Sequence, residues 1–227
     1  MENKFEMTKE ENIFVAKRNI IDYIWKSANL EGINVTFPQT SVIYEKGVLQ
    51  NANVHSISVV LNLKHAWQVL LNSLNEPLSI DYFCKINYEV AKDESLDWGK
   101  LRTGKVGISG TNYIPTTPDK DNVKEQLNAL MQIENQTERA IKIMFWAMKS
   151  QLFWDGNKRT AMLVANKVMI ENGCGIISVP IEKIEDFNIV LSDYYTNDTL
   201  NNAVEFIYNN CIDGIEFEKN KERKLMI

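Results

Sequence analysis

Apolar side chains recur at three- and four-residue spacing along most of this chain, the period of an α-helix that buries one face. A first helix is expected after Thr8, because Thr8 and Glu11 have the spacing of a capping box, and Gly32 is its expected end. The same period runs over about 56–74 and resumes after Ser79, a residue type common at helix N-termini. The remaining predictions are a short turn over about 40–45 and five helices over about 121–133, 137–151, 158–172, 181–194 and 199–212.

The segment over residues 98–118 breaks this helical period. Its glycines alternate with β-branched and aromatic residues, which predicts a short strand–turn–strand unit built on Gly104, Val106, Gly107, Ile108, Gly110 and Tyr113. The glycine spacing is weak evidence for a nucleotide loop, since no strand–helix unit surrounds it. The exposed edge of such a hairpin can instead accept an extended peptide. The predicted fold is therefore mainly α, with one β-hairpin.

The polar loop from Asp155 to Arg159 carries the candidate chemistry. It precedes a predicted helix, whose unpaired N-terminal N–H groups favour an anion. Asp155 is a hard oxygen ligand of the kind that holds Mg²⁺ together with substrate phosphates. Gly156 lets the backbone approach a ligand closely, Asn157 tolerates the dihedral angles of a tight turn, and Lys158 and Arg159 add positive charge. The loop is a candidate site for phosphate and Mg²⁺; the alternative is an ordinary helix–loop–helix corner.

Composition and charge exclude several classes of function. The 227 residues suffice for one domain with extensions, and the formal net charge of -5 argues against a surface that coats nucleic acid. Three widely separated cysteines indicate neither a disulfide framework nor a metal site. The two histidines, His55 and His65, have no second catalytic residue type beside them in sequence. Without an apolar leader or a long apolar run, we expect a cytoplasmic protein that binds neither nucleic acid nor membrane.

The stretch Gln151-Leu-Phe-Trp-Asp-Gly-Asn-Lys-Arg-Thr-Ala-Met162 resembles the signature of the Fic/Doc family, His-x-Phe-x-Asp/Glu-Gly/Ala-Asn-Gly/Lys-Arg-x-x-Arg. It matches at Phe153 and throughout the polar loop, whereas Gln151 replaces the His and Met162 replaces the last Arg. The expected hairpin from Gly104 to Pro115 resembles the flap on which that family binds its target. The resemblance covers about residues 10–212 and implies a Fic-like helical bundle with a hairpin flap.

The resemblance implies an enzyme that transfers AMP from ATP to a hydroxyl of a target protein. By position, Asp155 would hold Mg²⁺, Asn157 with the Gly156 and Lys158 backbone would form an anion hole, and Arg159 would pair with a phosphate. Phe153 would pack beneath the loop. The target protein would dock on the flap through Gly104, Val106, Ile108, Gly110 and Tyr113.

Gln151 stands where the family has its general base. A Gln amide can hydrogen-bond a hydroxyl but cannot take its proton, and a positioned base contributes roughly 10²- to 10⁴-fold in rate. Met162 stands where the family signature has its last Arg, so a second cation is missing from this sequence. The sequence thus predicts a Fic-like protein that binds nucleotide or regulates but is impaired in AMP transfer. A Doc-like phosphotransferase, which Lys158 and the apolar residue 162 favour, and a non-catalytic protein-interaction module remain open.

Ser27, Glu31 and Gly32 fit the family's inhibitory pattern, Ser/Thr-x-x-x-Glu-Gly/Asn, in which the Glu competes for the Arg that binds the terminal phosphate. That Arg is Met162 here. Glu31 therefore pairs with Arg159 or serves only as a helix C-terminal residue.

These features divide the chain into three parts. Residues 1–54 form an N-terminal helix and extension with the inhibitory pattern, residues 55–213 a Fic-like domain, and residues 214–227 a charged tail.

Overall fold

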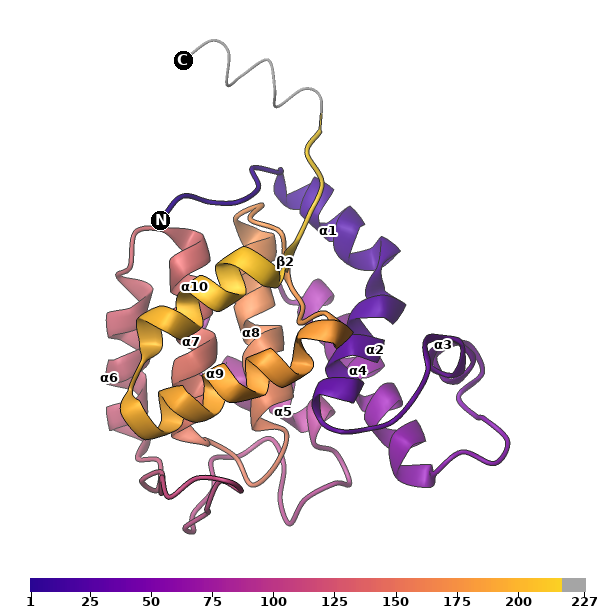
Figure 1. Cartoon of the computed structure of the whole chain (residues 1–227), viewed down its shortest axis with the longest axis horizontal. Coiled ribbons are helices and arrows are strands. Elements are labelled where there is room, and N and C mark those ends of the chain that lie inside the picture. Colours follow the sequence, from indigo (N-terminus) through magenta and orange to yellow (C-terminus); the bar gives the residue numbers. More distant parts are fainter. Residues whose placement is uncertain (218–227) are drawn as a thin grey trace.

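The computed structural model describes residues 1–217, and these form a mainly helical domain, which confirms the predicted fold class (Figure 1). Of the predicted charged tail, residues 218–227 lie outside the described residues. None of the described helices has the length and apolar character to cross a bilayer. In chain order the elements are α1 (Lys9–Arg18), α2 (Ile20–Leu30), α3 (Phe37–Lys46), α4 (Val54–Asn72), α5 (Ile80–Val90), α6 (Lys120–Met131), α7 (Gln136–Ser150), α8 (Asn157–Glu171), β1 (Ile176–Ile177), the 3₁₀ helix η1 (Ile181–Lys183), α9 (Ile184–Asn197), α10 (Leu200–Asn210) and β2 (Ile212–Asp213).

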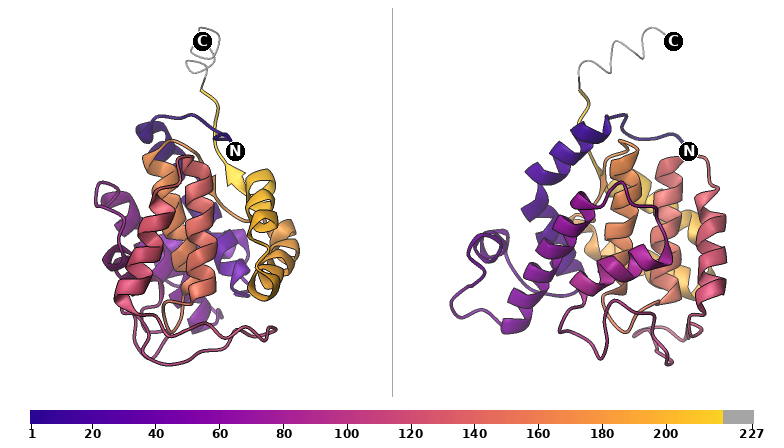
Figure 2. Two further views of the ribbon diagram at one scale, coloured as in Figure 1. Left: turned by 90° about the vertical axis from the view of Figure 1, so that its left-hand side faces the viewer. Right: turned by 180° about the vertical axis from the view of Figure 1, so that it is seen from behind.

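Helix α8 lies at the centre of the fold. Figures 1 and 2 show three layers, with α9 and α10 on one face, α7 and α8 in the middle, and α4 and α5 on the opposite face. Every residue of α8 from Arg159 to Ile170 is buried, as expected for a helix that neighbours surround on all sides. The core therefore holds α8 in place, and with it the polar loop that precedes its first turn.

The N-terminal segment forms two helices where one was predicted. The capping box is present: Thr8 Oγ1 accepts from the Glu11 N–H at 3.1 Å, and Glu11 Oε2 accepts from the Thr8 N–H at 2.8 Å. The helix is interrupted at Asn19, which leaves the helical region at ψ 13° and separates α1 from α2. Helix α2 ends at Leu30 and is followed by Gly32 at φ 77°.

Helix α3 replaces the short turn that was expected over 40–45. Thr36 and Gln39 form a second capping box, and Gly47 ends the helix at φ 74°. Pro38 falls in the first turn, where its missing N–H costs no hydrogen bond. The expectation of only a short turn was therefore wrong, since a proline at this position favours helix initiation.

The prediction of a strand–turn–strand unit over residues 98–118 is wrong, because this segment forms no strands. The described strands are β1 and β2, which pair antiparallel with Ile176 opposite Asp213. The flap segment, hereafter the flap loop (residues 104–116), is irregular, with a turn in which the Thr111 N–H donates to Ile108 O at 3.2 Å. Buried Arg102 holds its two arms by donating to the carbonyls of Gly104, Pro115 and Thr116. Hydrogen bonds from the Arg102 guanidinium thus hold the two arms of the flap loop together, where a ladder of strand hydrogen bonds was expected.

Candidate functional site

Asn157 sets the shape of the polar loop. Its Oδ1 accepts from the Phe153 N–H at 2.9 Å, and its Nδ2 donates to Phe153 O at 2.9 Å and to Gln151 Oε1 at 3.2 Å. Gly156 turns the chain into α8 at φ 71°, and a Cβ atom there would lie 2.8 Å from Val90 Cγ1. Only glycine fits this position without movement of α5. Phe153 is buried beneath the loop.

Asn87 of α5 anchors the same loop from the other side, and sequence reasoning missed it as a site residue. Its Nδ2 donates to Asp155 O at 3.0 Å and to Thr160 Oγ1 at 3.2 Å, while its Oδ1 accepts from the Gly99 N–H at 2.9 Å. The side chain is fully buried. The sequence did contain a signal for Asn87, namely an amide among the apolar residues on the core-facing side of α5. A buried amide needs hydrogen-bond partners, so such a residue is a candidate anchor.

Asp155 presents the one carboxylate of the polar loop, with its side chain half exposed. One of its oxygens, Oδ1, accepts from the Gly156 N–H at 2.5 Å and lies 3.5 Å from Arg159 Nη2. Among the described residues, no group of three His, Cys, Asp or Glu side chains could hold a metal ion. A Mg²⁺ ion at Asp155 would have to take its other ligands from phosphate and water, which is the usual way proteins hold this ion.

Arg159 and Lys158 differ sharply in environment. The Arg159 side chain is 4% exposed, and its Nη1 donates to Glu94 Oε2 at 2.9 Å and to Val90 O at 3.2 Å. Within the described part of the chain, Arg159 Nε is a buried nitrogen without a hydrogen-bond partner. The Lys158 side chain is 26% exposed, and its Nζ donates to Leu30 O at 3.2 Å.

Glu31 lies at the polar loop, as one of the two readings of the inhibitory pattern required. Its carboxylate is 3.5 Å from Lys158 Nζ and 3.9 Å from Arg159 Nε. Ser27 is buried on the same helix, and Gly32 follows with open space around its Cα. The structure thus brings the end of α2 and the start of α8 together, although about 125 residues separate them in sequence.

Gln151 ends α7 in a left-handed conformation, φ 45° and ψ 60°. Its side chain is engaged at both ends: Nε2 donates to Met148 O at 2.7 Å, and Oε1 accepts from Asn157. Its backbone carbonyl accepts from Arg102 Nε at 2.5 Å. Met162, the other altered signature position, is buried in the apolar core. Gln151 therefore acts as a structural junction and offers no base.

A cavity of about 370 Å³ joins the polar loop to the flap loop and α9. Its walls include Lys158, Gln151 and Tyr195, together with the turn of the flap loop, Gly107, Ile108, Ser109, Gly110 and Thr111. Burial, and secondarily the charge of Glu31, raises the pKa of Tyr195 well above its ordinary value, so its hydroxyl stays protonated and can donate a hydrogen bond. Sequence reasoning missed Tyr195; its signal was the adjacent aromatic pair Tyr194–Tyr195 near a predicted helix end.

The other predicted flap residues fix the loop instead of lining this cavity. Tyr113 stacks on the Tyr195 ring, with centroids 6.3 Å apart and planes at 10°. Gly104 approaches Trp154 so closely that a Cβ atom would lie 2.5 Å from its ring. Val106 is half-buried.

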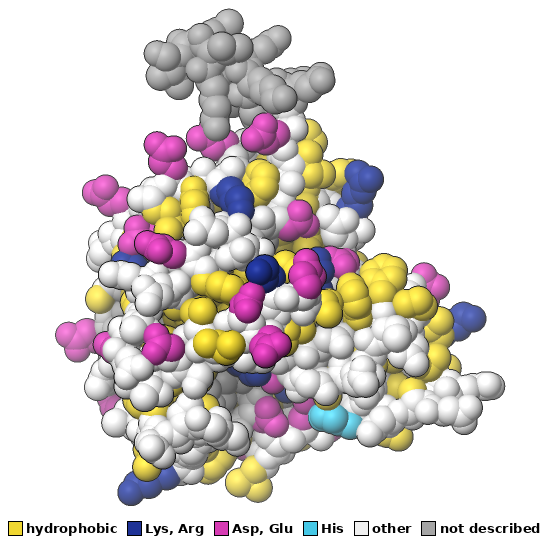
Figure 3. Space-filling view, in the orientation of Figure 1, with side chains coloured by type: hydrophobic (Ala, Val, Ile, Leu, Met, Phe, Trp, Pro, Cys, Tyr) yellow, Lys and Arg dark blue, Asp and Glu magenta, His cyan; other side chains and the backbone are white. Residues whose placement is uncertain are grey.

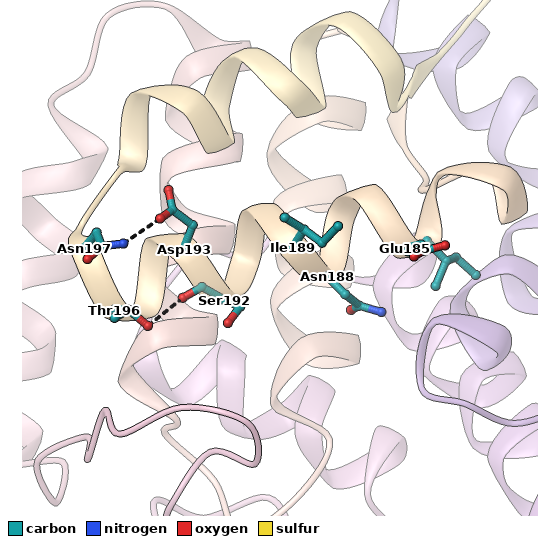
Figure 4. Close-up of a pocket in the computed structure, with 8 residues that line it drawn as sticks. Glu185, Asn188, Ile189, Ser192, Asp193, Thr196 and Asn197 are labelled. Atoms are coloured by element: carbon teal, nitrogen blue, oxygen red, sulfur yellow. Dashed lines mark hydrogen bonds between the residues drawn. The ribbon is translucent and has the colours of Figure 1, made fainter.

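A wider hollow of about 710 Å³ runs along the exposed face of α9 (Figure 4). Figure 4 shows its labelled side chains rising from that single helix, with Asn197 donating to Asp193 and Thr196 donating to the Ser192 carbonyl. Asn188 and Ser192 line both this hollow and the cavity, so the two are adjacent. On the face seen in Figure 3, acidic side chains are scattered widely and the basic ones do not gather into a patch.

These contacts define a helical domain in which the polar loop, the flap loop and α9 line one cavity, and the end of α2 lies against Lys158. Residues 77–169, which include α5, the flap loop and the polar loop, match the family model described as the Fic/DOC family. This part of the chain is thus similar to the Fic/DOC family.

The relatives place this domain among longer proteins. The protein adenylyltransferase fic-1 of Caenorhabditis elegans is 26% identical over 174 residues, which cover 70% of this chain and 34% of that protein. Its namesake in Caenorhabditis briggsae gives the same identity and coverage. The chain therefore spans about a third of the length of these curated relatives.

Solved structures show the same fold. A Fic-1 structure from C. elegans superposes with a TM-score of 0.74 at 22% identity, covering 87% of this chain and 62% of that one. A Fic domain-containing signaling protein from Bacteroides thetaiotaomicron gives a TM-score of 0.73 at 18% identity, covering 90% of this chain and 87% of that one. At these identities the likeness establishes the architecture.

Proposed function

We propose that this Fic-domain chain binds ATP with Mg²⁺ in the cavity between the polar loop, the flap loop and α9, and that it is impaired as an AMP transferase. The observation that carries the proposal is Gln151. Its amide, at the position of the general base, has both its nitrogen and its oxygen committed to other protein groups. Nucleotide binding is retained while proton removal is lost.

The anion-binding half of the proposal rests on the start of α8. This helix begins without a side-chain cap, so the N–H groups of its first turn are available to phosphate oxygens. Asp155 would hold the Mg²⁺ that accompanies the nucleotide, and that ion would neutralise phosphate charge. Asn157 keeps the loop open by bonding to Phe153, and Lys158 and Arg159 contribute positive charge. A target protein would dock on the flap loop.

No other base replaces the missing one in this proposal. His55 and His65 are both exposed on α4, and neither belongs to the cavity lining. Tyr195 does line the cavity, but its raised pKa keeps the hydroxyl protonated at neutral pH, so it can donate a hydrogen bond but cannot act as a phenolate base. The 26% identity to protein adenylyltransferases supports an AMP-transferase ancestry, and a nucleotide-sensing or regulatory role follows from the loss of the base.

A Doc-like phosphotransferase is the second candidate, because Lys158 lines the cavity and residue 162 is an apolar Met. The test incubates wild type, Gln151→His, and Gln151→His with Glu31→Gly, with ATP labelled separately at the α- and γ-phosphate. We expect no transfer by wild type and α-label incorporation by the double variant. Strong wild-type α-labelling would overturn the impaired-enzyme proposal, and γ-label transfer would favour the phosphotransferase. Calorimetry that detects no Mg²⁺–ATP binding by any variant would reject the nucleotide site.

A further inference from the structure

A second cavity, of about 350 Å³, lies between the flap loop, α6 and α7, and none of residues 155–159 lines it. Its size falls in the range of small-molecule sites, roughly 300–1,000 Å³. It adjoins the first cavity through one aromatic stack, since Tyr113 lines the second cavity and Tyr195 the first, with their rings 6.3 Å apart. The second cavity is therefore a candidate site separate from the polar loop.

Hydrogen bonds hold the walls of the second cavity in place. On the helical side, Trp146 Nε1 donates to Gln126 Oε1 at 2.7 Å, and Gln126 Nε2 donates to Asn122 Oδ1 at 2.7 Å. On the flap side, buried Arg102 donates to Thr116 O at 2.6 Å. These contacts join α6 to α7 and fix the arm of the flap loop, so a ligand would enter a cavity that is already formed.

Three aromatic side chains line the second cavity: Trp146, Tyr113 and Tyr194. Such walls suit a planar ring. Tyr194 is only 5% exposed, yet among the described residues none hydrogen-bonds to its hydroxyl. Burial, and secondarily the charge of Asp198, raises the pKa of Tyr194 well above its ordinary value, so this hydroxyl stays protonated and can donate.

Lys149 supplies the positive charge of the second cavity. Its ammonium lies 4.5 Å from the Tyr194 ring centroid and donates to Tyr194 O at 3.2 Å and to Asp198 Oδ1 at 2.6 Å. An ammonium has three donors, and no other described residue takes the third. The Asp198 side chain is 79% exposed, so its pair with Lys149 is open to competition from water or a ligand.

One carboxylate, Asp119, also lines the second cavity. Its Oδ1 accepts from the Asn122 N–H at 3.0 Å and caps the N-terminus of α6. The helix dipole offsets a negative charge at this position. The Lys149 ammonium is therefore the charge that decides which ligand the cavity selects.

We propose that the second cavity binds a small aromatic carboxylate, with its ring among Trp146, Tyr113 and Tyr194 and its carboxylate on the Lys149 ammonium. The Tyr194 hydroxyl is a second donor for the same group. This site stands apart from the proposed nucleotide site, and its test uses no nucleotide.

Titration of the full chain with benzoate, followed by NMR of the tryptophan indole N–H signals, tests the proposal. The chain has five tryptophans, and Trp146→Phe and Trp25→Phe assign two of the signals. We expect benzoate to shift the Trp146 signal with a Kd on the order of 1 mM. The Trp25 signal is the internal control, because this indole donates to Val35 O and does not line the second cavity. Benzamide, which lacks the charge, and cyclohexanecarboxylate, which lacks the aromatic ring, should both bind more weakly.

Variants of Lys149 test its assignment. Lys149→Met is expected to weaken benzoate binding at least about tenfold, because the carboxylate loses its ammonium partner. Lys149→Arg should retain binding, and Asp198→Asn should bind at least as tightly as wild type, since a competing carboxylate is removed. Lys142→Met is the matched control on the same helix, because Lys142 pairs with Glu138 and does not line the second cavity.

Three outcomes would overturn the proposal. Equal affinity of wild type for benzoate and benzamide would exclude recognition of the carboxylate, and this comparison requires no variant. Wild-type affinity in a Lys149→Met variant that is folded by circular dichroism would exclude Lys149 as the partner. Benzoate shifts at Trp25 without shifts at Trp146, or at neither signal, would reject the second cavity as the site.

Discussion

The side chains of Gln151 and Asn157 are hydrogen-bonded to each other, Asn157 Nδ2 donating to Gln151 Oε1 at 3.2 Å. This contact ties the last residue of the α7 turn to the first residue of α8. It uses the amide oxygen of Gln151 while the amide nitrogen bonds back to α7. The Gln151 side chain thereby forms a structural link between two central helices.

Asn157→Ala is expected to lower the free energy of unfolding by about 2–3 kcal/mol, because three hydrogen bonds are lost and the Phe153 N–H and C=O are left without partners. Mg²⁺–ATP affinity should fall as the polar loop loses its shape. Urea denaturation and calorimetry provide the two measurements. Asn157→Asp retains an acceptor for the Phe153 N–H and should have an intermediate stability. If Asn157→Ala is as stable as wild type, the hydrogen bonds of Asn157 do not hold the polar loop in shape.

Gly156→Ala is expected to destabilise the fold by at least about 2 kcal/mol, from the left-handed φ and from the close approach of the new Cβ to Val90. Gly47→Ala is the matched control. Gly47 has φ 74° but open space around it, so only the backbone penalty of about 1 kcal/mol applies. Thermal unfolding of both variants separates strain from crowding. Equal losses of stability in the two variants would show that Val90 and α5 move to accommodate the new Cβ atom without an energetic penalty.

Arg102→Ala is expected to release the flap loop. Among the residues that the structure describes, Arg102 hydrogen-bonds to backbone carbonyls and to no carboxylate, and burial lowers the pKa of its guanidinium. Removing it leaves those carbonyls without their donor, which should cost about 3 kcal/mol or more. Limited proteolysis should cut within residues 104–116 much faster than in wild type. Lys105→Ala, at an exposed position of the same loop, is the control and should leave the cutting rate unchanged.

Stability is expected to fall as pH rises from 8 towards 10. Burial raises the pKa of the Cys211 thiol to about 12 from an ordinary value of 9.0. A raised folded-state pKa means that the unfolded chain releases this proton first, so the contribution is complete below pH 9 and is lost as pH climbs towards 12. Chemical denaturation at pH 8, 9 and 10 measures the slope. Cys211→Ala should flatten it; an unchanged slope would show that other groups, such as the buried tyrosines, account for the effect.

Helix positions could be predicted where the signals were local. The Thr8 capping box and the apolar period of α7 and α8 depend on residues within one or two turns, and those predictions are confirmed. The flap loop was misjudged because its conformation depends on Arg102 reaching carbonyls more than ten positions away. Helix α3 was predicted too short because the effect of Pro38 depends on its position relative to a helix start.

The sequence by itself determined the fold class, the chemical content of the polar loop and the presence at position 151 of an amide that cannot take a proton, since these follow from residue type and short-range spacing. Tertiary structure alone decided which cation faces the cavity. Burial of Arg159 depends on Glu94, 65 positions earlier in the chain, and the pairing of Lys158 with Glu31 depends on the end of α2. Such contacts arise from how the helices pack around α8, and no local pattern in the sequence records them.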